Sequence, residues 1–218
     1  MKKIFRNNSL SIVFFLLFLI TLGAQAVTGL KEYNEERKDE GRGPASLSAY
    51  LSTGHFVEAT FENWESEFLQ MGLFVILTTF LFQKGSSESK DPDKTEEVDR
   101  KPSKNKKNTP WPVKKGGLVL SIYQHSLSIS LFLLFFLSFA MHWYGSLRDY
   151  NEKQQLKGLP TEHALSYLGN SKLWFESFEN WQSEFLSVFA IVILSIYLRE
   201  KNSPQSKPVD APHKETGE

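Results

Sequence analysis

Four segments without a charged side chain constrain this chain more than any other feature. They cover residues 7–30, 68–83, 116–147 and 185–198, so every charge lies between or beyond them, although the mean hydropathy of −0.30 is typical of a soluble protein. A helix that crosses a bilayer needs about 20 apolar residues, because each residue rises about 1.5 Å across a hydrocarbon core about 30 Å thick. The pattern therefore predicts a polytopic membrane protein.

The four uncharged segments differ in length. The first and third, with 24 and 32 residues, are long enough to cross a bilayer, whereas the second and fourth have only 16 and 14 residues. Lys84 and Arg199 follow the short segments directly, so these helices must extend toward the N-terminus, where Thr53 and Asn170 are candidate N-caps. The predicted spans cover residues 9–30, 61–83, 120–144 and 178–199.

The chain repeats itself at a constant offset of 117 residues. The segment FENWESEFL at 61–69 returns as FENWQSEFL at 178–186, and YNE at 33–35 returns at 150–152. Each copy contributes two spans, so both copies enter the membrane in the same direction. We therefore predict an all-α membrane protein with four transmembrane helices arranged as two tandem parallel helix–loop–helix repeats.

A cleaved signal peptide is the alternative interpretation of the first span. Three basic residues precede it, and AQA at 24–26 resembles a cleavage site. However, the uncharged segment exceeds the usual apolar region of about 7–15 residues. The equivalent site in the second copy is MHW at 141–143, where no signal peptidase would cut. Both observations favour retention of the first helix.

Composition divides the chain into four parts. The two membrane repeats occupy residues 1–83 and 116–200, a charged cytoplasmic linker occupies 84–115, and a cytoplasmic tail occupies 201–218. The linker and the tail combine charged residues, serine and proline with few apolar residues. They cannot bury enough apolar surface to fold, so we expect both to be disordered.

Lysine and arginine counts predict the orientation, because these residues concentrate in cytoplasmic connections. The linker holds ten of them, whereas the connections over 31–67 and 148–184 hold four each. The N-terminus, the linker and the C-terminus are therefore expected in the cytoplasm. Four tryptophans would then lie near the outer interface, where indole rings concentrate: Trp64, Trp143, Trp174 and Trp181.

Composition and motifs argue against several functions. Basic and acidic residues number 25 each, so no net charge attracts nucleic acid, and the absence of cysteine excludes thiolate metal sites and cysteine nucleophiles. The chain contains no G-x-S-x-G, Walker A or G-x-G-x-x-G motif, and its histidines lack metal-ligand spacing. We therefore expect no enzyme, no catalytic residue, no cofactor and no metal. The histidines considered are His55, His125, His142 and His163.

The repeated FENW segments carry polar residues at matching positions, opposite their aromatic residues on a helical wheel. The candidate polar site comprises Asn63, Glu67, Asn180 and Glu184. Two facing carboxylates at membrane depth would share a proton or bind a cation. Alternatively, they belong to the solvated face of an interfacial helix. Glu65 is a weaker candidate, because Gln182 replaces it in the second copy.

Two classes of function remain open. The favoured class is a non-enzymatic membrane protein that acts by assembly, as a homo-oligomer or with a membrane partner. The alternative is a small oligomeric proton or cation transporter or channel that uses the paired glutamates. In addition, six lysines before the third span either contact anionic lipid headgroups or only set the orientation: Lys101, Lys104, Lys106, Lys107, Lys114 and Lys115.

The sequence also resembles a known family. The segment GHFVEATFENWESEFLQM at 54–71, followed by FLFQKGS at 80–86 and SKDP at 89–92, closely resembles an uncharacterised bacterial family of membrane proteins, a domain of unknown function. The N-terminal helix with YNE at 33–35 is similar to it as well. The resemblance covers nearly the whole chain outside the linker and tail. It implies a bacterial inner-membrane protein with no known activity.

The predicted orientation can be tested by labelling single cysteines, because the chain has no native cysteine. Cysteines at Ser46 and Ser166 should react with a membrane-impermeant maleimide added to intact cells, whereas one at Ser103 should react only after the membrane is opened. Labelling of Ser103 in intact cells would overturn the orientation.

Overall fold

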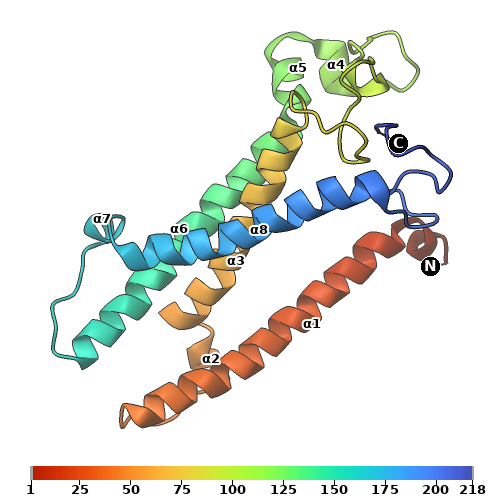
Figure 1. Cartoon of the computed structure of the whole chain (residues 1–218). Coiled ribbons are helices and arrows are strands. Elements are labelled where there is room, and N and C mark those ends of the chain that lie inside the picture. The colour runs from red at the N-terminus through yellow and green to blue at the C-terminus, as the bar shows by residue number, and fades with distance from the viewer. Residues whose placement is uncertain (1, 218) are drawn as a thin grey trace. The chain divides into compact units, whose positions relative to one another are not determined.

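The computed structural model describes residues 2–217, and every regular element in that range is helical. Figure 1 shows these elements in chain order. Four helices are long: α1 (Lys2–Asp39), α3 (Gly54–Leu77), α6 (Ser126–Leu156) and α8 (Ser171–Tyr197). The short elements are α2 (Leu47–Tyr50), a 3-10 helix (Glu97–Asp99), α4 (Trp111–Lys115), α5 (Gly117–Gln124) and α7 (Ala164–Tyr167).

Three of the long helices are long and apolar enough to cross a membrane. They are α1 over Ile4–Asp39, α6 and α8. The helix α3 has the length but not the composition, because its first 14 residues carry four glutamates: Glu58, Glu62, Glu65 and Glu67. The sequence prediction of an all-helical membrane protein is confirmed to this extent.

The predicted N-caps of α3 and α8 are confirmed. The hydroxyl of Thr53 accepts a hydrogen bond from the backbone N–H of Phe56 at 3.2 Å. The side-chain oxygen of Asn170 accepts one from the N–H of Lys172 at 2.9 Å. Such bonds satisfy N–H groups in the first helical turn that have no intrahelical partner.

Two predicted boundaries are wrong. The second span was expected over 61–83, but α3 ends at Leu77, where the hydroxyls of Thr78 and Thr79 bond back to the preceding carbonyls. The third span was expected over 120–144, but His125 has non-helical backbone angles that separate α5 from α6. Helices therefore end inside uncharged segments that a hydropathy plot shows as continuous, because local side-chain hydrogen bonds and backbone angles interrupt them there.

The chain divides into two compact units, and each is described by itself. The first unit comprises residues 1–61 and 140–173. In it, the beginning of α3 and the end of α6 cross with their backbones in contact at two glycines. A Cβ atom on Gly54 would lie 2.4 Å from the backbone N of Asp149, and one on Gly145 would lie 2.4 Å from the backbone N of Glu58. No residue larger than glycine fits at either position without a shift of the helices.

The second unit comprises residues 62–139 and 174–218, and aromatic rings of α6 and α8 pack against one another in it. The ring of Trp181 packs edge-on against Phe178, with centroids 5.5 Å apart, and against Phe135 at 6.2 Å. Gly72 on α3 faces the ring of Phe132 on α6, which would lie 3.2 Å from an added Cβ. Aromatic packing and small residues thus join α3, α6 and α8 within this unit.

The linker and the tail contact each other within the second unit. The ammonium of Lys207 is buried and donates hydrogen bonds to the carbonyl oxygens of Gly85 at 2.5 Å and Glu215 at 2.7 Å. Burial, together with the positive charge of Arg199, lowers the pKa of Lys207. The disorder expected of both segments stays a prediction.

The glycine crossing predicts the effect of two substitutions. Gly145→Ala should destabilise the protein by about 1–3 kcal/mol, because its new methyl group overlaps the backbone of α3. Gly23→Ala is the matched control, since nothing lies within 4 Å of its Cβ, and it should be neutral or stabilising by up to about 1 kcal/mol. Thermal unfolding in detergent measures both, and equal effects of the two changes would contradict the crossing.

Candidate functional site

The four predicted site residues all lie in the second unit. Asn63 and Glu67 on α3 are exposed, whereas Asn180 and Glu184 on α8 are half-buried. The charge of Glu67 acts on the carboxyl group of Glu184, so the structure brings the two glutamates within electrostatic reach. Asn180 instead donates its side-chain N–H to the carbonyl of Glu176 within α8, at 3.1 Å.

The buried carboxylate of this region is Glu65, which sequence reasoning had ranked lower for breaking the repeat. Glu65 is fully buried, and its Oε1 accepts a hydrogen bond from the indole Nε1–H of Trp181 at 2.9 Å. This bond links α3 to α8. The N–H of a half-buried tryptophan needs an acceptor, and that requirement is the sequence signal that points to a carboxylate on a neighbouring helix.

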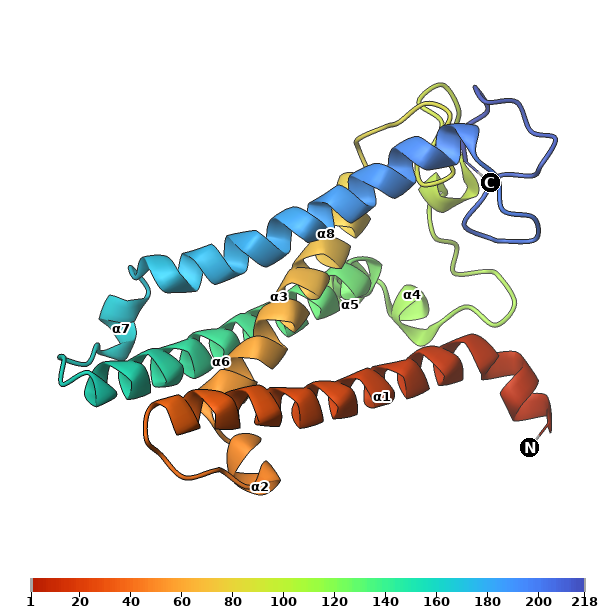
Figure 2. The same ribbon diagram turned by 60° about the horizontal axis from the view of Figure 1, so that its bottom comes forward.

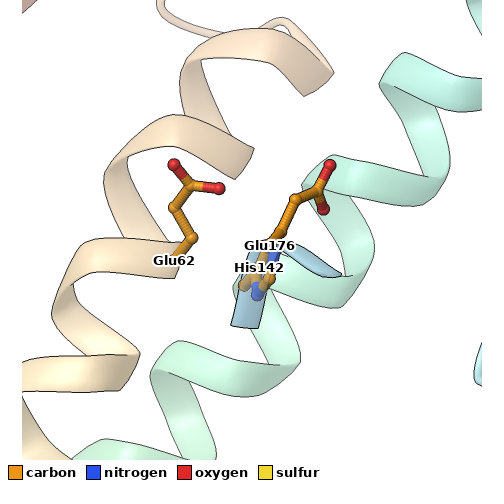
Figure 3. A group of neighbouring side chains, drawn as sticks. All are labelled: Glu62, His142 and Glu176. Carbon is orange, nitrogen blue, oxygen red and sulfur yellow. The ribbon is translucent and has the colours of Figure 1, made fainter. Parts of the chain in front are cut away.

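Two further glutamates of the second unit lie close together. Figure 3 shows Glu62 on α3 and Glu176 on α8, which each place a carboxylate oxygen within 4.8 Å of the other. Sequence reasoning missed both. Repeat symmetry did not point to Glu176, because the residue that aligns with it in the first copy is Ala59. The expectation of no metal site stays a prediction.

The first unit holds a charged network that the sequence did not predict. The ammonium of Lys172 lies 2.6 Å from Glu58 Oε1 and 3.7 Å from Asp149 Oδ2. Asp149 also pairs with Lys153 at 3.0 Å. The network joins α3, α6 and the start of α8 beside the glycine crossing. Because the acidic and basic groups of this network are paired with one another, we interpret it as stabilising the fold.

Tyrosines pack where each loop meets the preceding long helix. The Tyr33 and Tyr50 rings lie 5.4 Å apart between centroids, and the Tyr150 and Tyr167 rings lie 5.2 Å apart. Burial, helped by the charges of Glu32 and Glu36, raises the pKa of Tyr50 to about 12. Its hydroxyl therefore stays protonated at neutral pH.

The four histidines considered in the sequence occupy separate kinds of position. His55 places Nδ1 3.2 Å from the hydroxyl of Tyr50, and His142 is fully buried on α6. His163 precedes α7 as its N-cap without a side-chain cap bond, and His125 is exposed at the break between α5 and α6.

These features define an all-helical protein with three helices able to span a membrane and with polar side chains that link its helices. The chain belongs to the family described as a domain of unknown function, DUF6766, whose model matches residues 1–218. The expectation that the chain belongs to an uncharacterised family is thereby confirmed. Neither a curated protein nor a solved structure matches the chain.

The bond between Glu65 and Trp181 can be measured with a double-mutant cycle. Glu65→Leu and Trp181→Phe should each lower the thermal stability, and the double variant should lose less than their sum, with a coupling of about 1 kcal/mol. Glu67→Leu combined with Trp181→Phe is the control, because Glu67 is exposed, and its effects should add. Additive effects for Glu65 and Trp181 would mean that the bond contributes nothing.

Proposed function

We propose that this chain is a non-enzymatic multi-pass membrane protein, with four spans in two tandem parallel repeats, that acts by assembly with other membrane helices. Element boundaries support the repeat. At the offset of 117 residues, both ends of α2 coincide with those of α7. The first residue of α3 coincides with that of α8, and the last residue of α1 with that of α6.

Local contacts that recur at the same offset also support the repeat. The side-chain oxygen of Asn34 accepts a hydrogen bond from the backbone N–H of Ala45 at 2.7 Å, and its side-chain N–H donates one to the carbonyl of Ala45 at 3.2 Å. The side chain of Asn151 does the same with Glu162, at 2.8 and 2.9 Å. The same pair of hydrogen bonds between an asparagine side chain and the backbone therefore closes the loop in both copies. Because α3 is the counterpart of α8, which has the length and composition of a span, we assign α3 as the fourth span.

The localisation follows from the charge distribution. The ten lysines and arginines between residues 84 and 115 favour a cytoplasmic linker, and with an even number of spans on each side both termini are cytoplasmic as well. We therefore place the protein in the inner membrane of a bacterial cell, in line with the resemblance described above.

The observation that carries the assembly function is the exposure of α1. None of its most apolar 18-residue stretch is buried, and the large side chains from Val13 to Ile20 are exposed in succession, hence on every side of the helix. Asn63 and Glu67 are exposed as well. In a bilayer, the exposed apolar surface of α1 is available to lipid and to another helix, and packing between spans depends on close contact of side chains.

A second candidate function is a proton or cation pathway. The interaction between Glu67 and Glu184 favours it, because two neighbouring carboxylates at membrane depth share protons or bind cations.

Photo-crosslinking tests the assembly function. A benzophenone amino acid placed singly at positions 10–20 of α1 should yield a discrete crosslinked protein at positions three to four residues apart, because one face of the helix would be occupied. Crosslinks to lipid alone at every position would contradict assembly through α1.

Flux in proteoliposomes tests the alternative. If assembly is the function, purified protein should produce no proton or potassium flux above protein-free vesicles. A flux that Glu67→Gln and Glu184→Gln each abolish, and that Glu32→Gln leaves intact, would establish the transport function instead.

A further inference from the structure

The segment Lys101–Gln124 combines unpaired positive charge with exposed apolar side chains. No aspartate or glutamate occurs between Lys101 and Leu147, and the six lysines named above are all exposed. Lys106 approaches Glu97 at 3.8 Å. Across residues 2–217, the other five take part in no ion pair.

Lysines of the preceding linker segment differ in this respect. Lys84 lies 2.9 Å from Asp93, Lys90 lies 2.7 Å from Asp99, and Lys94 lies 3.3 Å from Asp91. In the first half of the linker the lysines are therefore paired with acidic residues, whereas most of the lysines from Lys101 to Lys115 are not.

The apolar side chains of α4 and α5 are exposed beside these lysines. Trp111 is 64% exposed, Leu118 77% and Ile122 53%, and the ammonium of Lys115 lies 5.0 Å from the centroid of the Trp111 ring. The helix α5 carries no charged residue and runs into α6, which has the length and composition of a span, through the break at His125. In Figure 1, α4 and α5 lie at the beginning of α6.

The first repeat begins in a similar way. Asn8, which aligns with His125 at the offset of 117, has non-helical backbone angles within α1, and Figure 2 shows the resulting bend near the N-terminus. Ile4 and Phe5 before the bend are exposed, and the sequence there includes Lys2, Lys3 and Arg6. Each repeat thus enters its first span through a bent segment that is both basic and apolar.

We infer that α4 and α5, with the lysines that precede and join them, form an anchor that lies on the cytoplasmic surface of the membrane and recognises anionic lipid headgroups. Apolar side chains at this position would enter the headgroup region, and indole rings favour that depth. The free lysines would contact acidic headgroups, which attract basic segments close to a span. A soluble acidic partner would use the lysines but would not account for the exposed Trp111, Leu118 and Ile122. The inference rests on the cytoplasmic orientation proposed for the linker.

The test uses the full chain reconstituted into liposomes. A single cysteine in the variant Leu118→Cys is labelled with the environment-sensitive dye NBD, in vesicles of phosphatidylcholine with or without phosphatidylglycerol. The emission should shift to shorter wavelength and be quenched by spin-labelled lipid, more strongly with phosphatidylglycerol. Raising the salt from about 0.1 to 1 M should reduce the effect of the anionic lipid, since the screening length falls from about 10 to 3 Å.

Two sets of substitutions test whether the lysines recognise the anionic lipid or only lie close to the membrane. Replacing Lys101, Lys104, Lys107, Lys114 and Lys115 by glutamine should abolish the dependence on phosphatidylglycerol. The matched control replaces Lys84, Lys90 and Lys94, whose charges are already paired, and should leave it unchanged. Trp111→Ala should weaken the quenching in both lipids.

The inference is overturned if the dye reports water in both lipids, or if both lysine sets act alike. It is also overturned if a soluble polyanion, short heparin, binds the segment while the dye stays in water. Maleimide labelling at Ser103 distinguishes these failures from failure of the proposed orientation: a linker labelled from outside contradicts the orientation, whereas a correctly oriented linker without a spectral shift contradicts only the anchor.

Discussion

The hydrogen-bonding requirement of the peptide backbone in hydrocarbon governs this protein. Within a bilayer no water is available to N–H and C=O groups, so an apolar segment must satisfy them within itself, as a helix does. The long helices α1, α6 and α8 meet that requirement along uncharged stretches. Polar side chains in such helices then need partners on neighbouring helices. The bond between Glu65 and Trp181 in the second unit is one solution, and the ion pair between Lys172 and Glu58 in the first is another.

Close approach of helices makes these polar contacts available. At Gly54 and Gly145 the backbones of α3 and α6 touch, and the charged groups of Glu58 and Asp149 lie beside that crossing. Small residues are common at helix contacts in membranes, where dispersion between close backbones replaces the hydrophobic effect as a source of stability. The same crossing lets the ammonium of Lys172 reach both carboxylates, so the packing and the charge network depend on each other.

Part of the fold and little of the site could be predicted. Uncharged segments, two of them short, predicted all four long helices, and capping chemistry predicted the starts of α3 and α8. The ends at Leu77 and His125 escaped prediction, because hydropathy averages over windows and does not register single backbone torsions. At the site, repeat symmetry pointed to Glu67 and Glu184 and directed attention away from Glu65, which is buried against Trp181. Burial depends on what a neighbouring helix presents, and an internal alignment does not contain that information.

By itself the sequence determined that the chain is helical, where its charge-free segments lie, which residues recur at an offset of 117, and that basic residues concentrate between residues 84 and 115. These are properties of residue order, and they act through local hydrogen bonding and transfer into hydrocarbon. Only the tertiary structure decided that Glu65 is buried against Trp181 while Glu67 is exposed, and that Lys172 lies between Glu58 and Asp149. The physical reason is that Glu65 and Trp181 are 116 positions apart, and Lys172 and Glu58 are 114 apart, so their proximity arises from helix packing rather than from local sequence.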